Sequence, residues 1–235
     1  DDLCANGSKE FVENTVELLR SNLTISKVVY DSFRFCGLDL TQKKGKIELS
    51  MEDYCKSMFV APIPTKTKKT EKLTPKQSTM LRALVGSLAW LSLNVRLDLC
   101  YGAHQLSQKL QEGTIKDLQL ANFMVKKAQE RHNRIVFSSL GRPEYLRIFG
   151  FSDASYNTDT RSTGGQIIML GNVRNDSVTP LLWKTKIIKK VCRSSKDAES
   201  LSLSTLCDYS IHLGKQLEEI IYNVRDGSKY KPVLF

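Results

Sequence analysis

The segment from Leu146 to Leu206 constrains the fold most, because strand, hairpin and helix patterns follow one another there in a fixed order. Its first part, LRIFGFSDASYN, has the apolar and aromatic content of a buried or half-buried strand that ends at Asp153. Apolar runs at 166–170 and 181–188, separated by a turn at 172–176, predict two more strands. A helix is expected to begin at Ser194, so the segment predicts a βββα unit.

The predicted helix carries an acidic residue on its apolar face. Ser194 and Asp197 have the spacing of a capping box, in which each side chain binds the backbone amide of the other. Positions that recur every three or four residues share one helical face, and here they are Glu199, Leu203, Leu206, Ser210, Leu213, Leu217 and Ile220. Burying an unpaired carboxylate costs several kcal/mol. Glu199 is therefore expected to be protonated, to pair with a cation, to lie at the open end of the face, or to bind a metal together with Asp153. The alternative is that Asp153 only ends a strand and Glu199 is an exposed first-turn acid stabilised by the helix dipole.

The net charge favours polyanionic partners. The chain carries a formal charge of +10 and has a pI near 9.3. Five cations without an intervening acid precede Glu199 and predict a nucleic-acid-binding loop: Lys184, Lys186, Lys189, Lys190 and Arg193. No apolar run of membrane-spanning length and no signal-peptide pattern is found, so we expect an intracellular, cytoplasmic protein without a membrane partner.

The first 140 residues predict strands followed by helices. Strands are expected at 33–40 and 46–49, and Ser50 with Asp53 predicts a capping box for a short helix. The lysine- and proline-rich stretch 61–76 is typical of a linker. A helix should begin at Thr74-Pro75, with further helices at 98–112 and 115–130. The inward face of the first of these helices should contain Leu81, Leu84, Leu88 and Leu91.

Four short motifs in this order resemble the ribonuclease H domain of copia-type LTR retrotransposon polyproteins. They are Phe151–Ala154, Thr160–Gly165, Trp183–Lys186 and Ser194–Glu199, which are similar to the YSDADW, TRxSTSG, WxSKKQ and SSxEAE patterns of that family. Further upstream, Leu84–Leu91 and Arg96–Tyr101 resemble the LVGSLLYL and RPDIAY elements of the family's thumb and connection region.

The resemblance implies a two-metal site. Asp153 and Glu199 match the first two metal-binding carboxylates of the family, in which two Mg²⁺ ions (or Mn²⁺) support cleavage of the RNA strand of an RNA–DNA hybrid. The family's third aspartate follows the strand after this helix, and the matching strand here is 231–235. Asp1 and Asp2 match the pair of metal-binding aspartates in the polymerase YxDD motif. We therefore expect a fragment, or a decayed or truncated copy, of a longer polyprotein.

The expected fold is a mixed α/β (α+β) chain. It would comprise a reverse-transcriptase palm remnant at 1–60, a helical thumb/connection region at 61–141, and an incomplete RNase H-like domain at 142–235 with a mixed sheet and a helix. The parent would act as an RNA-directed DNA polymerase (nucleotidyltransferase) and as an endonuclease on RNA–DNA hybrids, with an RNA template and DNA as further partners. It would be cytoplasmic, with the nucleus or virus-like particles as alternatives. The rival hypotheses are a catalytically inactive nucleic-acid-binding or assembly remnant, and a product that does not fold.

Overall fold

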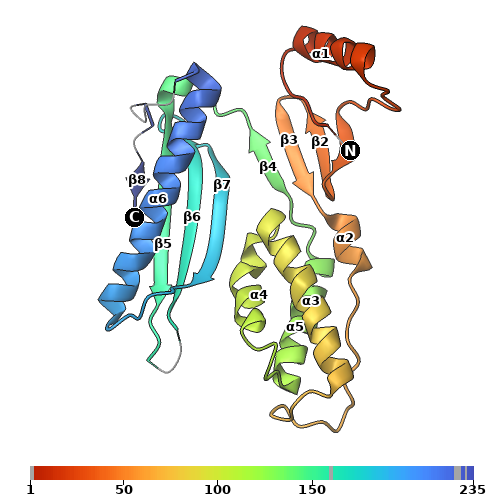
Figure 1. Cartoon of the computed structure of the whole chain (residues 1–235), viewed down its shortest axis with the longest axis vertical. Coiled ribbons are helices and arrows are strands. Elements are labelled where there is room, and N and C mark those ends of the chain that lie inside the picture. The colour runs from red at the N-terminus through yellow and green to blue at the C-terminus, as the bar shows by residue number, and fades with distance from the viewer. Residues whose placement is uncertain (1–2, 159–160, 225–228, 231) are drawn as a thin grey trace.

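The computed structural model describes residues 3–158, 161–224, 229–230 and 232–235, and it contains two separate four-stranded sheets with helices (Figure 1). The mixed α+β class is therefore confirmed. The elements are α1 Lys9–Asn22, β1 Ser32–Phe35, β2 Leu38–Lys43, β3 Lys46–Ser50, α2 Glu52–Ser57, α3 Pro75–Asn94, η1 Leu97–Leu99, α4 Cys100–Ser107, α5 Ile115–Glu130, β4 Ile135–Ser138, η2 Pro143–Tyr145, β5 Leu146–Ser155, β6 Thr163–Asn172, β7 Val178–Ile187, α6 Ser195–Tyr222 and β8 Val233–Leu234.

The first sheet is antiparallel, in the order β1-β2-β3-β4. The single strand predicted at 33–40 is wrong, because the chain reverses at Cys36-Gly37 and pairs Phe35 with Leu38. Both turn residues have positive φ, 49° and 79°, as a two-residue type I′ hairpin requires. The apolar positions shift at this turn, from Phe33 and Phe35 to Leu38 and Leu40, so both the glycine and the shift indicate it.

The short helix α2 is not capped as predicted. Met51 occupies the N-cap position without a side-chain hydrogen bond. Asp53 instead accepts a 2.8 Å hydrogen bond from Nη2 of Arg34, on β1. The Ser50–Asp53 capping box is therefore wrong, because a cation from the neighbouring sheet takes the carboxylate.

The helical layer follows the predicted pattern closely. Thr74 and Gln77 form a capping box at the start of α3, with Pro75 in the first turn. The predicted inward leucines of α3 are all buried: Leu81, Leu84, Leu88 and Leu91. They join residues of α2, α4 and α5 in the larger core.

The predicted linker 61–76 is held against the helices. Asn122 of α5 forms two 2.8 Å hydrogen bonds with the backbone of Ala61, one through its oxygen and one through its nitrogen. Lys72 makes an isolated β-bridge with Thr114. The stretch connects the first sheet to α3, and its ends are fixed by these contacts.

The second sheet has the order β7-β6-β5-β8, with α6 packed on β5 and β6. The three predicted strands and the helix are confirmed. Strands β5, β6 and β7 are antiparallel, whereas β8 lies parallel to β5 and pairs Val233 with Phe149. The chain thus runs through three antiparallel strands, crosses the sheet as a helix and returns beside the first strand.

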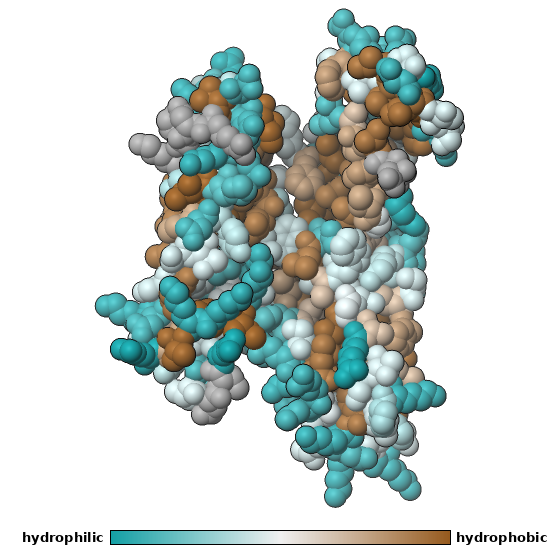
Figure 2. Space-filling model, viewed as in Figure 1, coloured by the Kyte–Doolittle hydropathy of each residue, from teal (hydrophilic) through white to brown (hydrophobic). Residues whose placement is uncertain are grey.

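The two sheets are linked through the helical layer, where α4 packs against β7. Trp183 of β7 donates a 2.7 Å hydrogen bond from Nε1 to the carbonyl of Ser92 in α3, and its ring packs against the larger core. Figure 2 shows brown, apolar residues along the recess between the two halves of the molecule. We call residues 3–145 the N-terminal half and the described residues from Leu146 onward the C-terminal unit. No helix among the described residues is both long and apolar enough to cross a bilayer.

Candidate functional site

Asp153 lies near the end of β5, and its side chain points away from α6. A Cβ added at Gly164, which pairs with Ala154, would meet Oγ of Ser202 in α6 at 2.9 Å. Ala154 and Gly164 therefore belong to the face that α6 covers, and Asp153, the preceding residue in the strand, belongs to the other face. The Asp153 carboxylate is exposed and makes no hydrogen bond or ion pair with another described residue.

Asp153 borders a pocket of about 260 Å³ between the second sheet and the beginning of α4. Phe151, Ile167 and Trp183 lie side by side across the three strands and form one part of its lining. Leu97 and Tyr101 face them from the helical layer. We call this the junction pocket. Its lining combines aromatic and apolar side chains with one carboxylate.

Glu199 is exposed on α6, at the N-terminal end of the predicted face. Leu203 and Ile220, at the two ends of the predicted face, are 41% and 78% exposed. The buried residues of α6 recur at intervals of four, and only Leu206 and Ser210 among them belong to the predicted face. They are Ala198, Ser202, Leu206, Ser210, Gly214 and Glu218. Glu199 lies just after the first turn of α6, whose acidic residue is Asp197, and its exposure agrees with both the open-end and the solvent-exposed interpretations.

Ser202 is the site residue that the sequence analysis missed. Its Oγ accepts a 2.8 Å hydrogen bond from Nε2 of Gln166 and donates a 3.1 Å bond to the carbonyl of Asp153. The serine thereby connects α6 to both β5 and β6. The only signal in the sequence is the row of small residues four apart, which permits a helix to approach a sheet closely.

The two predicted metal ligands on the described residues are not brought onto one face. Asp153 faces the junction pocket, whereas Glu199 stands on α6 outside its buried row. Within the part of the chain that the structure describes, no three His, Cys, Asp or Glu side chains are grouped so that they could hold a metal ion. Asp153 and Glu199 do not by themselves fit an Mg²⁺ site. Asp1 and Asp2, and Thr160 of the hairpin motif, lie outside the described residues.

The N-terminus of α6 is capped largely as predicted. Ser194 Oγ accepts a hydrogen bond from the backbone N–H of Asp197 at 3.2 Å. The Asp197 carboxylate accepts from the N–H of Arg193 at 3.0 Å, rather than from Ser194. This contact fixes the end of the basic loop against the helix.

The five predicted nucleic-acid-binding cations lie on β7 and the loop that follows it. None of Lys184, Lys186, Lys189, Lys190 and Arg193 forms an ion pair with a described carboxylate. We call them the basic edge, because β7 is the edge strand of its sheet.

Tyr209 of α6 holds one lysine of the basic edge in place. Nζ of Lys184 donates a 2.9 Å hydrogen bond to the Tyr209 hydroxyl and lies 4.7 Å from the ring centroid. The hydrogen bond from Lys184 lowers the pKa of Tyr209, and the neighbouring Lys184 ammonium lowers the pKa of Lys186. Two cations this close form a positive site that an anion would stabilise.

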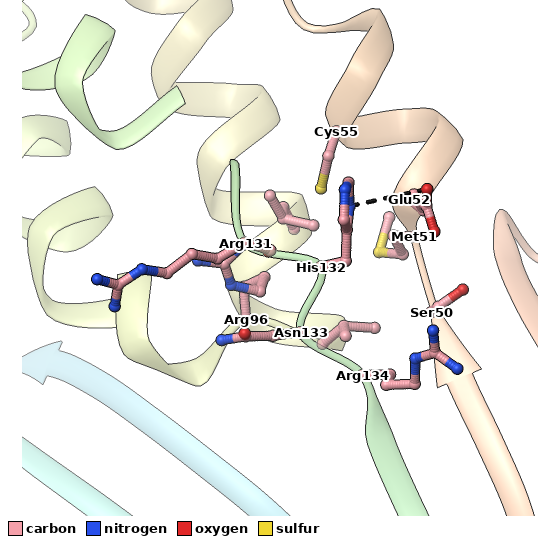
Figure 3. A pocket seen from close by; sticks show the side chains of 11 residues that line it. Ser50, Met51, Glu52, Cys55, Arg96, Arg131, His132, Asn133 and Arg134 are labelled. Atoms are coloured by element: carbon pink, nitrogen blue, oxygen red, sulfur yellow. Dashed lines mark hydrogen bonds and ion pairs between the residues drawn. The ribbon is translucent and has the colours of Figure 1, made fainter. Parts of the chain in front are cut away.

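A second cavity, in the N-terminal half, is too small for a ligand. It measures about 10 Å³, room for about one water molecule. Figure 3 shows His132 and Glu52 pointing toward each other at its edge, with 3.8 Å between Nδ1 and the carboxylate. Beside it, the buried guanidinium of Arg96 binds both carboxylate oxygens of Asp98, at 2.8 and 3.0 Å. Arg96 also binds the last carbonyls of α5, so this region is structural.

Comparisons with known proteins did not assign the chain to a family. Neither the protein-family models nor the curated proteins gave a match. The functional argument therefore rests on the residues and on the geometry described above.

Proposed function

We propose that this chain is a nucleic-acid-binding part of a copia-type reverse transcriptase/ribonuclease H polyprotein, and that RNA–DNA hybrid binds along the basic edge. The observation that carries the proposal is the group of five cations on β7 and its loop, none paired with a described acid. Phosphate oxygens of the nucleic acid would pair with these cations, and release of counterions would drive association.

The order of elements in the C-terminal unit supports this assignment. The resembling motifs fall on β5, at the start of β6, on β7 and at the N-terminus of α6. This sequence of strand, hairpin, strand, basic loop and helix is the one that the resemblance implies. In the parent protein, Asp1 and Asp2 would belong to a separate site for DNA synthesis on an RNA template.

Hybrid binding can be tested by fluorescence anisotropy with a labelled RNA–DNA duplex over a range of salt concentrations. Replacing both Lys186 and Lys190 by alanine should weaken binding and reduce the slope of log K against log [salt] by about one for each lysine that contacts a phosphate. The matched control replaces Lys9 and Lys56, which are ion-paired lysines of the N-terminal half. Equal losses in the two double variants would contradict binding at the basic edge.

Metal-dependent cleavage of the hybrid is the second candidate function, and the position of β8 favours it. The Phe235 ring stacks on Phe151 at 5.1 Å, and the Phe235 N–H donates to the Gly150 carbonyl at 2.8 Å. If β8 continued in this register, the second residue after Phe235 would lie level with Asp153 and point to the same face. The third carboxylate of the resembling family follows this strand, so it would come close to Asp153.

Cleavage should be assayed with Mg²⁺ or Mn²⁺ and a hybrid labelled on its RNA strand, using the longest natural form of the chain. Loss of cutting in both Asp153→Asn and Glu199→Gln would support the two-metal site. Loss of cutting in Asp153→Asn but not in Glu199→Gln would show that Glu199 is not a ligand of the metal site. A folded protein that binds the hybrid and leaves the RNA intact would refute cleavage and keep binding as the function.

A further inference from the structure

We propose that the junction pocket receives a nucleobase with an exocyclic amino group, turned out of a single strand, and that Asp153 accepts the hydrogen bond from that group. The inference rests on the proposed function, because it assumes that nucleic acid approaches the basic edge. It adds a base-reading site on the face of the sheet opposite α6.

The floor of the junction pocket is open at one strand position. Asp153, Gly165 and Thr185 lie side by side across β5, β6 and β7. A Cβ added at Gly165 would have no atom within 4 Å, whereas one at Gly164 would meet Ser202. The free space of the pocket therefore reaches the backbone of β6, directly between the carboxylate and the edge strand.

Aromatic rings border this space. Trp183 is fixed by its hydrogen bond to the Ser92 carbonyl, so its ring is already oriented in the absence of a ligand. Phe151 and Tyr101 also line the pocket, and Tyr101 is 56% exposed. Flat nucleobases stack on such rings whatever their sequence, because every base has a π-face.

The polar character of the junction pocket selects for hydrogen-bond donors. Its charged lining residues are Asp153 and Lys184, and the Lys184 ammonium is bound to Tyr209 on the opposite face of the sheet. The ionised Asp153 carboxylate can only accept hydrogen bonds. It would accept from the amino group of cytosine, but it would meet the O4 acceptor of thymine or uracil.

The alternation of side chains along β7 connects the junction pocket to the basic edge. Lys184 lies on the α6 face, and its neighbours Trp183 and Thr185 lie on the pocket face. Because β7 is an edge strand, a nucleic-acid strand that runs along it can keep its phosphates near the lysines and turn one base across the edge. The base would then pass over Thr185 and Gly165 to reach Asp153.

The test compares anisotropy binding of labelled dC10 and dT10, which differ in the group presented to Asp153. The unmodified chain should prefer dC10 by about fivefold or more. Asp153→Asn should remove the preference, because an amide both donates and accepts. Gly165→Val should weaken dC10 binding about tenfold by filling the pocket, while Gly165→Ala, which adds one carbon, should have a smaller effect.

Gly165→Val and Gly165→Ala should bind RNA–DNA hybrid as tightly as the unmodified chain, because the proposed contact of the duplex is the basic edge. Equal affinity for dC10 and dT10, or a Gly165→Val variant that binds dC10 normally, would overturn the base pocket and leave hybrid binding intact. Absence of binding to both oligonucleotides and hybrid would overturn the proposed function as well. If Gly165→Val fails to fold, Asp153→Asn still tests the pocket, because Asp153 is exposed and its substitution should not disturb folding.

Titration with 5′-CMP and 5′-UMP tests whether the junction pocket binds a free nucleotide or only a base within a strand. Trp183 reports occupancy by its fluorescence once the other tryptophan, Trp90, is replaced by phenylalanine. We expect CMP to bind far more weakly than dC10, because it lacks the phosphates that reach the basic edge. CMP binding as tight as that of dC10 would overturn the assignment to a strand.

Discussion

The N-terminal half and the C-terminal unit differ in where ion pairs between described residues are found. In the N-terminal half, ion pairs join described residues at positions from Lys9 to Glu144. In the C-terminal unit, the five cations of the basic edge and the Asp153 carboxylate form no ion pair with another described residue. Paired charges hold a structure together, whereas exposed unpaired charges are available to ligands. Under the proposed function, the ion pairs of the N-terminal half are structural and the basic edge is the binding surface.

The two regions also differ in how their layers pack. The larger core, from Met51 to Ile135, is built mainly from leucines of α3 and aliphatic residues of α4 and α5. The core of the C-terminal unit is smaller, and α6 lies on the sheet through small and polar residues such as Ser202 and Gly214. The first region draws its stability from apolar burial, and the second depends on close fit and on a few hydrogen bonds.

The largest expected effect comes from the buried cation of the N-terminal half. Arg96→Met should lower the free energy of unfolding by about 3 kcal/mol, because Asp98 would keep only Lys127 as a partner and the carbonyls of Ala128 and Arg131 would lose their donor. Arg134→Ala, which removes an exposed partner of Glu48, should cost less than about 1 kcal/mol. Urea denaturation measures both values. If both variants lost the same free energy of unfolding, the buried ion pair would stabilise this half no more than the exposed one does.

An intermediate effect should come from two adjacent glycines of the C-terminal unit. Gly164→Ala should destabilise by about 1–3 kcal/mol, because the new Cβ would displace Ser202 from its hydrogen bonds to Gln166 and Asp153. Gly165→Ala enters open space and should leave stability unchanged or raise it by up to about 1 kcal/mol. Thermal unfolding of the two variants measures how much stability a methyl group costs on the α6 face and on the pocket face of the sheet. Equal stability of both would show that the close fit of α6 contributes little.

The smallest expected effect is a pH dependence that arises from Asp98. The hydrogen bond from Arg96, supported by Lys127, lowers the pKa of Asp98 to about 2 from its ordinary 3.8. A lowered pKa in the folded state adds stability that is present above pH 3.8 and is lost as the pH falls toward 2. Solvent screening limits this contribution to about 1 kcal/mol.

Unfolding measured between pH 6 and pH 2 should show this loss, and Asp98→Asn should flatten that part of the profile. If Asp98→Asn lost as much stability as the unmodified chain between pH 4 and pH 2, other carboxylates would be the cause of the pH dependence.

Regular periodicity made most of the helices and strands predictable. The inward leucines of α3, the capping box at Thr74 and the three strands of the second sheet follow from local patterns. A single strand over 33–40 is wrong, because the apolar positions shift at Cys36-Gly37 and the chain reverses there. The cap expected at Ser50 was missed because Asp53 binds Arg34, a residue far from it in the sequence.

The candidate site was less predictable than the fold. Asp153 was found from the strand that it ends, and the basic edge from its run of lysines. Only Leu206 and Ser210 of the predicted face of α6 are fully buried, because small residues such as Ser202 and Gly214 let the helix approach the sheet closely. The hydrogen bonds of Ser202 depend on pairing between segments more than thirty residues apart, which a local pattern does not contain.

The sequence by itself determined the α+β class, most element boundaries and the positive charge of the β7 loop, because each depends on neighbouring residues along the chain. Only the tertiary structure decided which face each carboxylate occupies. That choice depends on the register between β5 and β6 and on the rotation of α6, and both are set by packing between distant segments. The junction pocket exists for the same reason, since its lining comes from α4, β5, β6 and β7 together.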